Sequence, residues 1–460
     1  MSPHSGPHPD AILSLRPIND NAWEVVQHQN NQHLRSYLGD GSTGLDIGHF
    51  SSYLGGGVLA TLGRRGDILV EGASISKIQC SFEIDEITNA VMFYDRSHSQ
   101  TSAVGGFNAY PFQHGRPRKV VVHPNFNSRI GMGGVGRDLV QFDLQWHKFP
   151  VQRDQTAIHP HFARTINDND TVQPSQYGTR AYTLAPGELE LRCFQESRIG
   201  SGGFGNVYRG VDVDSGLVVA VKVIDRTQHM DNETWWKMKS EVTLIRSVQH
   251  PHIIHYIDSR GWEGTTARIY MDLKDGSLTG LMLGPWALPP NQVADTALFQ
   301  MLQAIDYLGT HGVVHRDIKP DNILYVYRES RFRFCLADFG LASQSTLATS
   351  TVGTPGFMAP ECFQQGVRQT HQADVWSLFA TILWIMDTRG FRQASASVTP
   401  TPGSCLEVQA RASGLTGIWE MAIEDPNERA SAAQMLVKRF NGLGLTTKPS
   451  CVPPLKPRTT

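Results

Sequence analysis

Two stretches in the second half of the chain carry the residue types that phosphoryl transfer requires. VVHRDIKPDNIL contains Asp317, Lys319 and Asn322, and LADFGLAS contains Asp338. Asp317 can orient an attacking hydroxyl or accept its proton, and Lys319 can neutralise the transferred phosphoryl group. Asn322 and Asp338 offer the oxygen ligands that suit Mg²⁺. Each residue alone also fits an ordinary structural position, whereas the four in this order predict catalysis.

A glycine-rich segment upstream, GSGGFGNVY, could hold a phosphate group. Glycines let a backbone turn tightly and bring its N–H groups close to an anion. By itself such a segment is more often only a turn. The candidate nucleotide-binding residues of this segment are Gly200, Ser201, Gly202, Gly203, Phe204, Gly205 and Val207.

The residues after the glycines make a phosphate site more convincing. Lys222 of VAVK lies on the next predicted strand, and Glu241 lies on a predicted helix from which its carboxylate could hold that lysine. A dinucleotide-binding fold would open a helix at the glycines and place an acid about 20 residues further on. Both sides of this loop are strand-like, so that alternative fails.

The elements that must position these residues follow from hydrophobic periodicity. After Glu188, strand-like runs (LRCFQESRIG, NVYRGVDV, LVVAVKVI) precede helix-period segments such as NQVADTALFQMLQAIDYLGTHG. Residues 386–415 look loop-like. We expect an α+β domain over residues 188–441, followed by a Pro-rich, disordered tail over 442–460.

The first half of the chain has a different pattern. Short alternating or apolar runs, including AILSL, VLATL, DILV, IQCSFEI, AVMFYD, RKVVV and LVQFDLQW, predict strands, and DEITN predicts a hairpin turn. Strands at this spacing favour an all-β sandwich over residues 10–147. Residues 148–187 lack periodicity and read as a linker. The predicted fold class is therefore multidomain.

Residues 191–441 resemble a eukaryotic protein kinase domain, on the motifs quoted above together with MAPE, DVWSL and DPNERAS. The resemblance implies a bilobal α+β fold that uses ATP and Mg²⁺, with Lys222 paired to Glu241. It also implies that Asp374 anchors the catalytic loop and that Arg429 pairs with Glu361. The remaining residues that it implies for the nucleotide pocket are Ala220, Met271, Asp272 and Leu273.

The same resemblance implies an activation segment between Asp338 and MAPE. Its candidate phosphate acceptors are Thr346, Thr349, Ser350 and Thr351. A phosphate on one of them could pair with Arg316, although a Ser/Thr-rich loop can also simply be flexible. Lys319 and Thr354 of GTPGF are similar to the Ser/Thr-specific branch of the family.

In the first half, LGRRGDILVEGASISKIQCSF and FYDRSHSQTS resemble a forkhead-associated (FHA) domain, a β-sandwich that binds phosphothreonine peptides through loops at one end. The resemblance implies that Arg64 contacts phosphate, that Ser76 donates its hydroxyl and that Lys77 adds charge. Gln79 replaces the family's structural histidine. Ser99 and Gln100 replace its Asn-Gly pair. The chain therefore predicts either phosphopeptide binding or a sandwich that has lost it.

Composition excludes little and suggests an intracellular protein. The formal net charge of −2 gives no argument for binding nucleic acid. No apolar run approaches the length of a membrane span, MSPHSGPHPD does not look like a secretory signal, and the six cysteines are far apart. We expect a location in the nucleus or cytoplasm, with protein substrates and phosphothreonine proteins as partners.

A chain that combines these two domains resembles the fungal checkpoint-type kinases that carry an FHA domain. The primary hypothesis is an active serine/threonine kinase that is directed or activated through its N-terminal module. The alternative is a phosphopeptide-binding scaffold whose kinase fold serves only as a docking or allosteric element.

Overall fold

A computed structural model of the protein describes most of the chain as two compact units. The described residues are 6–52, 57–148, 190–202, 205–226, 230, 232–246, 248–285, 288–340, 343–344, 353–364, 366–396 and 404–456. The first unit comprises residues 1–157, 184–199 and 208–219. The second comprises residues 158–183, 200–207 and 220–460. Most of the predicted linker therefore lies outside the described residues.

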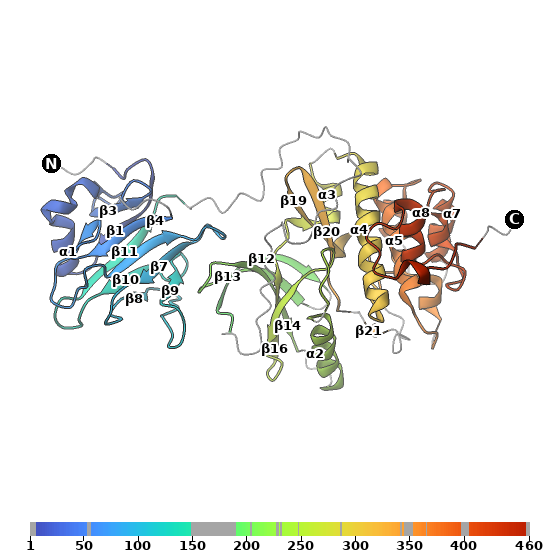
Figure 1. Ribbon diagram of the computed structural model, residues 1–460, viewed down its shortest axis with the longest axis horizontal. Coiled ribbons are helices and arrows are strands. Elements are labelled where there is room, and N and C mark those ends of the chain that lie inside the picture. Colours follow the sequence, from blue (N-terminus) through green and yellow to red (C-terminus); the bar gives the residue numbers. More distant parts are fainter. Residues whose placement is uncertain are drawn as a thin grey trace. The chain divides into compact units, whose positions relative to one another are not determined.

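The first unit is built on two β-sheets (Figure 1). The sheet with the order β2-β3-β1-β11-β10-β8 contains β1 (Ala11–Pro17), β2 (Arg35–Tyr37), β3 (Thr43–Gly48), β8 (Ala103–Gly105), β10 (Arg129–Met132) and β11 (Val140–Trp146). The sheet with the order β5-β4-β6-β7-β9 contains β4 (Val58–Gly63), β5 (Ile68–Leu69), β6 (Cys80–Ile84), β7 (Val91–Asp95) and β9 (Lys119–Val121). All the predicted strands are present.

Residues of both sheets form one hydrophobic core. Leu13 and Leu15 of β1 and Phe93 of β7 belong to the same buried cluster. Because successive side chains on a strand point to opposite faces, the spacing of such residues assigns one face of each sheet to this core. The turn predicted at DEITN joins β6 to β7, where the Asp85 carboxylate accepts the N–H of Thr88 at 2.9 Å.

One helix of this region was not predicted. α1 (Asp20–Gln27) begins after Asn19, whose side chain accepts the N–H of Ala22 at 3.0 Å as an N-cap. A 3₁₀ turn, η1 (Gln29–Leu34), follows it. The helix is only eight residues long, and its buried residues Ala22, Val25 and Val26 have the spacing of one helical face.

The glycine-rich segment and Lys222 belong to a third large sheet, which has the strand order β12-β13-β14-β16-β15. Its strands are β12 (Cys193–Gly202), β13 (Gly205–Asp212), β14 (Val218–Asp225), β15 (Tyr256–Arg260) and β16 (Thr266–Asp272), and α2 (Asn232–Arg246) lies between β14 and β15 in sequence. The strand-like runs and the first helix predicted after Glu188 are thus confirmed.

The rest of the second unit is mainly helical. Its helices are α3 (Leu278–Leu283), α4 (Pro290–Thr310), α5 (His371–Met386), α6 (Phe391–Ala396), α7 (Ser404–Ala412) and α8 (Ala432–Phe440). Its small sheets contain β17 (Gly276–Ser277), β19 (Ile323–Arg328) and β20 (Arg331–Leu336), and β18 (Val313–Val314) with β21 (Ser343–Gln344). Short 3₁₀ turns are η2 (Pro320–Asn322), η3 (Pro355–Phe357), η4 (Pro360–Phe363), η5 (Trp419–Ala422) and η6 (Pro449–Cys451).

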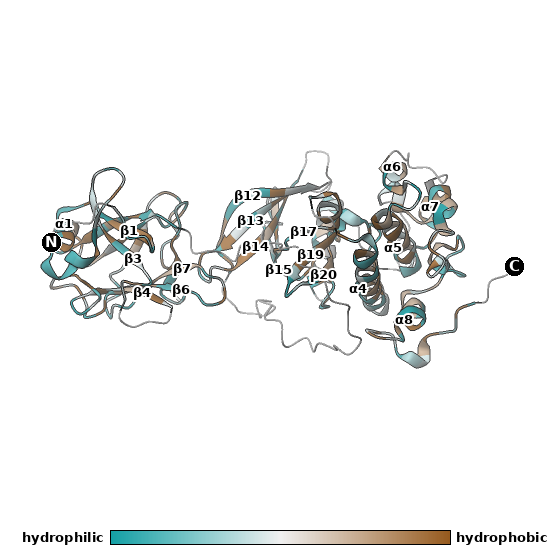
Figure 2. Ribbon diagram, turned by 90° about the horizontal axis from the view of Figure 1, so that it is seen from above, coloured by the Kyte–Doolittle hydropathy of each residue, from teal (hydrophilic) through white to brown (hydrophobic). Residues whose placement is uncertain are grey.

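Helix α5 is the centre of this helical part. Nearly all of its residues are buried, and Figure 2 shows it brown along most of its length. It packs beside α4, as Figure 1 also shows. A helix that is apolar on every side is expected to be surrounded by other elements. The loop-like reading of residues 386–415 was incomplete, because α6 and α7 form there.

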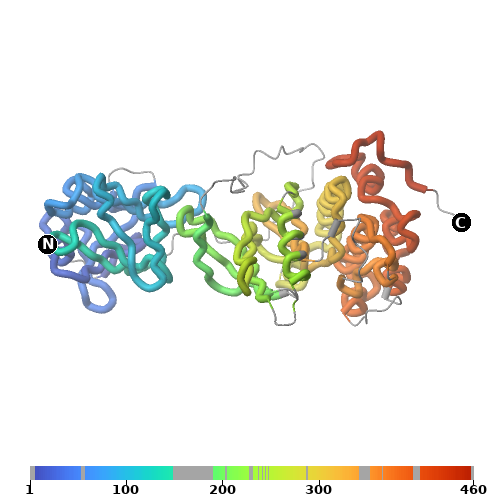
Figure 3. The backbone as a smooth tube through the Cα atoms, turned by 90° about the horizontal axis from the view of Figure 1, so that it is seen from below, coloured from blue at the N-terminus to red at the C-terminus, as the bar shows by residue number. Residues whose placement is uncertain are grey.

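The prediction of a disordered tail is wrong for residues 442–456. The N–H groups of Thr446 and Thr447 donate to the buried Asp306 of α4 at 2.7 and 2.9 Å, and Leu445 and Leu455 pack against the core. Figure 3 traces this segment in red past the yellow α4. Pro-rich composition suggested disorder, but these hydrogen bonds and apolar contacts hold the backbone in place.

Two features are absent from the described residues. No helix within the described ranges is long and apolar enough to cross a membrane. The six cysteines, all of which are described, are free, in agreement with their distant spacing.

Candidate active site

The loop that carries Asp317 is held by a buried carboxylate on α5. Asp374 accepts the backbone N–H groups of His315 and Arg316, each at 2.8 Å. Burial raises the pKa of Asp374 to about 6, although both hydrogen bonds favour its charged form. Arg316 has a φ of +70°, a rare conformation for this residue type. The predicted role of Asp374 as the anchor of this loop is confirmed.

The Asp317 carboxylate is surrounded by donors. Thr354 Oγ1 donates to its Oδ1 at 2.7 Å, and Lys319 Nζ donates to its Oδ2 at 2.8 Å. Asn322 Nδ2 donates to Oδ2 at 2.9 Å. Lys319 Nζ also reaches Thr354 Oγ1 at 2.6 Å. The structure therefore places three of the predicted residues around the carboxylate of a fourth, Asp317, and fixes its orientation.

His315 contacts the backbone on both sides of this site and was not among the predicted site residues. It is buried, and its burial lowers the pKa to about 4, so the ring is neutral at pH 7. Its Nδ1 accepts the N–H of Asp317 at 3.3 Å, so its Nε2 carries the proton that it donates to the Ala337 carbonyl at 3.0 Å. The signal in the sequence is its place two residues before Asp317.

Asp338 lies against Lys222 of β14. Lys222 Nζ is 2.6 Å from Asp338 Oδ1; the Lys222 side chain is 10% exposed and that of Asp338 is 31% exposed. Burial alone would raise the pKa of Asp338, but the Lys222 ammonium outweighs it and the pKa is lowered, so the carboxylate is ionised. Glu241 belongs to α2, but its side chain lies outside what the structure describes. The Lys222–Glu241 pair therefore stays a prediction.

One hairpin, formed by β19 and β20, positions the two candidate metal ligands Asn322 and Asp338. In the β19–β20 pair Ile323 lies opposite Leu336, and the Ala337 N–H donates to the Asn322 carbonyl at 2.8 Å. This pairing brings Asn322 and Asp338 to the same end of the hairpin. An amide oxygen and a carboxylate suit Mg²⁺, which binds through few protein ligands and keeps several waters or phosphate oxygens. The donor set fits that ion. The described residues contain no cluster of three His, Cys, Asp or Glu residues that could hold a metal by itself.

The ring of Phe339 fixes the backbone beside Asp338. Phe339 is buried, with its ring centroid 4.6 Å from that of His315 and 6.3 Å from that of Tyr256 on β15. Asp338 itself has a φ of +59°, which turns the chain sharply at this residue. Phe339 is a second positioning residue that sequence reasoning left out, although it follows Asp338 directly.

The glycine-rich segment joins β12 to β13. Gly205 has a φ of +145°, and a Cβ at this position would lie 2.0 Å from the Val223 carbonyl oxygen, so only glycine fits there. Gly200, Ser201 and Gly202 belong to β12, and Val207 belongs to β13. Gly203 and Phe204 lie outside the described residues.

The other predicted pocket residues lie on neighbouring strands. Ala220 of β14 and Met271 of β16 are buried, and Asp272 ends β16. The Asp272 N–H donates to the His255 carbonyl at 3.1 Å. Val207 and Leu273 are partly buried against the same hydrophobic cluster as Ala220 and Met271. This apolar set is compatible with a flat aromatic base, while its role in binding ATP stays a prediction.

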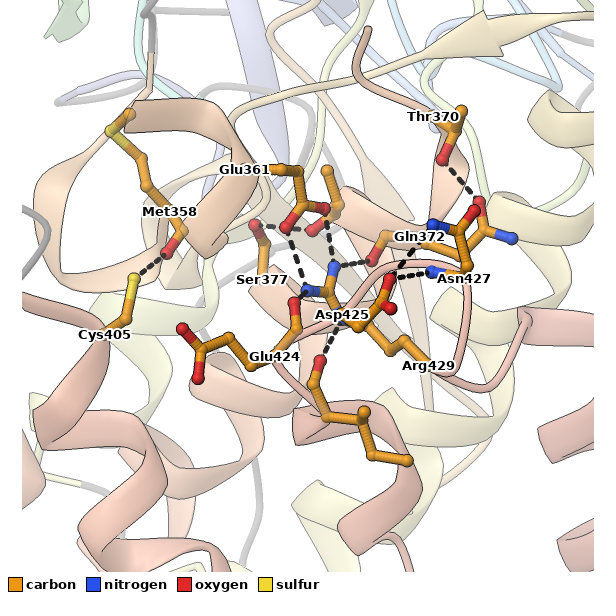
Figure 4. Close-up of polar contacts among 12 residues, drawn as sticks. Met358, Glu361, Thr370, Gln372, Ser377, Cys405, Glu424, Asp425, Asn427 and Arg429 are labelled. Carbon is orange, nitrogen blue, oxygen red and sulfur yellow. Dashed lines mark hydrogen bonds and ion pairs between the residues drawn. The ribbon is translucent and has the colours of Figure 1, made fainter. Parts of the chain in front are cut away.

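A buried ion pair closes the end of the predicted activation segment. Arg429 Nη1 and Nη2 donate to Glu361 Oε1 and Oε2 at 2.6 and 2.9 Å, and neither side chain is more than 3% exposed (Figure 4). Arg429 also donates to the carbonyls of Gln372 and Glu424 at 2.9 and 2.8 Å. The predicted Glu361–Arg429 pair is confirmed. The candidate phosphate acceptors Thr346, Thr349, Ser350 and Thr351 lie outside the described residues.

Three loops meet at one end of the first unit's sheets. The Arg64 N–H donates to the Ser76 carbonyl at 3.1 Å, and Arg64 Nε donates to the Ile75 carbonyl at 2.7 Å. Gln79 is fully buried; its Oε1 accepts the Ser76 N–H at 2.9 Å and its Nε2 donates to Thr101 Oγ1 at 2.9 Å. Gln79 thus braces the Ser76 loop against the loop that carries Ser99.

The exposed residues of this loop cluster are those with charge or hydroxyl groups. Arg64, Lys77 and Ser99 are exposed, and Ser76 is half-buried. Arg118 is an unpredicted brace, because its Nη2 donates to the carbonyls of Gln100 and Ser102 at 3.0 Å each. Nothing in its local sequence signals that contact.

These geometries define a class: a domain whose ordered aspartate, lysine and oxygen ligands are arranged for ATP-dependent phosphoryl transfer. Comparison with known families agrees, since residues 194–441 match the protein kinase domain. The chain belongs to the protein kinase family. The match covers more than half of the chain and leaves residues 1–193 and 442–460 outside it.

Similar individual proteins are protein kinases of several kinds. The chain is 35% identical over 191 residues to cell division control protein 7 of Schizosaccharomyces pombe, covering 41% of this chain and 17% of that protein. It is 34% identical over 208 residues to mitogen-activated protein kinase kinase kinase 2 of Arabidopsis thaliana, covering 42% and 31%. It is 34% identical over 184 residues to serine/threonine-protein kinase 36 of Pongo abelii, covering 39% and 14%.

The chain spans less than a third of the length of each of these relatives. The family match and these relatives identify residues 194–441 as an ATP-dependent protein kinase domain of the serine/threonine class. In such domains a divalent metal typically accompanies ATP.

Proposed function

We propose that this chain is an active serine/threonine protein kinase that uses Mg²⁺ and ATP to phosphorylate protein substrates. The single observation that carries the proposal is the Asp317 carboxylate, whose two oxygens are oriented by Thr354, Lys319 and Asn322. A protein that kept the fold only for docking would have no need to preserve this set of donors.

Asp317 would act on the substrate hydroxyl. Its oxygens are held in place by donors on two sides, so the incoming serine or threonine hydroxyl can be positioned for attack without reorganising the carboxylate. Lys319 bridges Asp317 and Thr354 and would lie beside the transferred group, where its charge stabilises negative charge that spreads over the phosphoryl oxygens.

Asn322 and Asp338 would hold Mg²⁺, which neutralises phosphate charge when it is bound. Lys222 is now paired with Asp338 at 2.6 Å and would turn to the α- and β-phosphates of ATP when nucleotide and metal are present. The glycine-rich segment would bring backbone N–H groups to the same phosphates. Met271, Asp272 and Leu273 would contact the adenine end.

The test of this proposal is transfer of the γ-phosphate to a generic serine/threonine substrate. We expect the full chain to label the substrate and Lys222→Met to reduce the rate at least tenfold, because the phosphates lose their cation. The matched control is Lys239→Met, since Lys239 is a partly exposed lysine of α2 that pairs with Glu263. Equal background labelling by the unaltered chain and Lys222→Met would reject the enzyme proposal and favour the scaffold.

We further propose that the N-terminal domain is FHA-like and binds phosphothreonine peptides through the loop cluster around Ser76. Two β-sheets around one core support such a fold, and the exposed Arg64 and Lys77 supply positive charge beside the Ser76 hydroxyl. Within the described residues Arg64 Nη1 and Nη2 make no hydrogen bond, so the guanidinium can turn to a phosphate dianion. Buried Gln79 fills the structural place of the family's histidine.

Binding of the full chain to phosphothreonine peptides in a peptide library tests this second proposal. We expect Arg64→Ala to weaken binding at least tenfold. Arg129→Ala is the matched control, because Arg129 is a similarly accessible arginine that pairs with Asp143 elsewhere in the same domain. Absence of binding by the unaltered chain, or equal binding by Arg64→Ala, would favour a sandwich without this activity.

A further inference from the structure

The sheet β5-β4-β6-β7-β9 has one face in the core of the first unit, so the side chains on its other face would be expected to be exposed. Two of them, on β7 and β9, are buried instead. Val91 and Phe93 of β7 enter the core between the sheets, so Met92 points to the opposite face. Val121 of β9 likewise points outward. Yet Met92 and Val121 are only 0% and 2% exposed. Something in the first unit must therefore bury this outer face.

The residues that bury it come from the start of the kinase family match. Val211 of β13 and Val213 belong to the same buried cluster as Met92 and Val121. Phe194 of β12 packs against that cluster, with its ring centroid 4.7 Å from that of Phe126. All of these residues lie inside the first compact unit.

Backbone contacts extend the sheet at this place. β9 is an edge strand, and its Val121 N–H donates to the Val213 carbonyl at 2.8 Å. An unpaired edge is a site where another strand can add. The Thr88 hydroxyl also donates to the Ser215 carbonyl at 3.4 Å. The β12–β13 segment thus buries the apolar face of the sheet and accepts a backbone hydrogen bond from its edge strand.

Charged groups surround the apolar contact. Arg116 Nη1 is 2.7 Å from Asp214 Oδ2, and Arg192 Nη2 is 3.2 Å from Asp214 Oδ1. Arg192 Nη1 donates to the Pro111 carbonyl at 2.7 Å. The three charged side chains are at most 19% exposed. An apolar centre with a rim of ion pairs is the anatomy of a specific interface.

We propose that residues 6–148 form a regulatory domain that packs against the start of β12 and the end of β13 and thereby strengthens nucleotide binding. The chain of β12 runs from Phe194 directly into Gly200, and β13 runs from Gly205 back to Val211. The two strands that flank the glycine-rich segment are therefore anchored at their far ends. Fixing those ends limits the conformations of the segment and lowers the cost of ordering it around phosphates.

A nicked full-length chain tests the proposal. A cleavage site for a sequence-specific protease is inserted at residue 165, and the cut protein is passed over a size-exclusion column. We expect the two fragments to elute together. We expect the same cut in a Phe194→Ser, Arg116→Ala variant to separate them, because the apolar centre and one rim pair are lost. The control pair is Phe107→Ser with Arg129→Ala; Phe107 is 82% exposed, and these fragments should stay together.

Affinity for a fluorescent ATP analogue is the second readout, and it needs no catalysis. We expect the interface variant, uncut and still folded by thermal melting, to bind the analogue at least threefold more weakly than the control pair. Separation of the fragments of the otherwise unaltered chain would overturn the docking proposal. If the cut interface variant separates but the uncut variant binds the analogue as tightly as the control pair, the regulatory part of the proposal is wrong. Neither result depends on whether the chain transfers phosphate.

Discussion

At the scale of single residues, the site is organised by carboxylates that differ in their surroundings. Asp317 is saturated with donors, Asp338 faces a lysine, and Asp374 is buried against two backbone N–H groups. Asp374 holds the loop, and under the proposed function Asp317 would orient the substrate hydroxyl and Asp338 would bind the metal. The motifs around these aspartates suggested their roles, although the groups that orient Asp338 and Asp374 are distant in sequence: Lys222 contacts Asp338, and His315 and Arg316 donate to Asp374.

Thr354 is the residue whose role is most open to a direct check. Its hydroxyl connects Asp317 and Lys319, so Thr354→Val keeps the shape but removes the hydrogen bonds. We expect kcat to fall by about tenfold or more, in line with the loss of about 1.4 kcal/mol or more of transition-state stabilisation. Thr354→Ser should keep most of the activity. Equal rates for Thr354→Val and Thr354→Ser in a steady-state assay would show that the hydroxyl does not matter.

At the scale of elements, strands with clear alternation and long amphipathic helices could be predicted, whereas short polar elements could not. The stretch that contains η1 and β2, QNNQHLRSY, is mostly polar and has no clear periodicity. It is ordered because buried Asn31 donates to the carbonyls of Val25 and Leu69 and accepts the Leu69 N–H. Hydrogen bonds of that kind depend on distant segments, as does the contact of Thr447 with Asp306. Neither leaves a periodic signal in the sequence.

The buried pair of Glu361 and Arg429 fixes η4 to the loop before α8. Arg429→Met would leave the Glu361 carboxylate buried without its partner, and we expect about 3–5 kcal/mol of lost stability. For a domain of this size that corresponds to a decrease of roughly 10 °C in Tm. Arg411→Met is the control, because the Arg411–Glu407 pair is a half-exposed pair within one helix turn. Similar Tm values for the two variants by calorimetry would contradict this account.

The segment before β15 makes the second unit sensitive to acid. Burial lowers the pKa of His250 to about 3 and that of His252 to about 4. Since both values lie below the unfolded value of 6.5, the unfolded chain binds more protons between pH 6.5 and about 4. Stability should therefore fall as pH drops through that window, by about 1.4 kcal/mol per pH unit for each histidine.

Urea unfolding at pH 7, 6 and 5 measures this slope. His252→Gln removes one titrating group and should make the decrease between pH 6.5 and 5 shallower than in the unaltered chain. Equal slopes would mean that the ring does not titrate in this range or that it is not buried in the folded chain.

At the scale of the whole molecule, the chain combines a kinase domain with an N-terminal β-rich domain that the kinase family match does not cover. The kinase assignment could be made from sequence because its motifs are short, specific and in fixed order. The FHA-like assignment rests on looser motifs. What could not be predicted is the burial of Met92 and Val121, since an outward-facing apolar residue does not reveal which segment covers it.

The measurement that tests the central claim most directly is the initial rate of phosphate transfer by two aspartate variants. Asp317→Asn removes the oriented carboxylate, whereas Asp321→Asn changes an exposed aspartate four residues along the same loop. We predict that Asp317→Asn is at least about a hundredfold slower than the unaltered chain, and that Asp321→Asn stays within a few-fold of it. Equal rates for Asp317→Asn and the unaltered chain, with both proteins folded, would contradict the assignment of this chain as an active protein kinase.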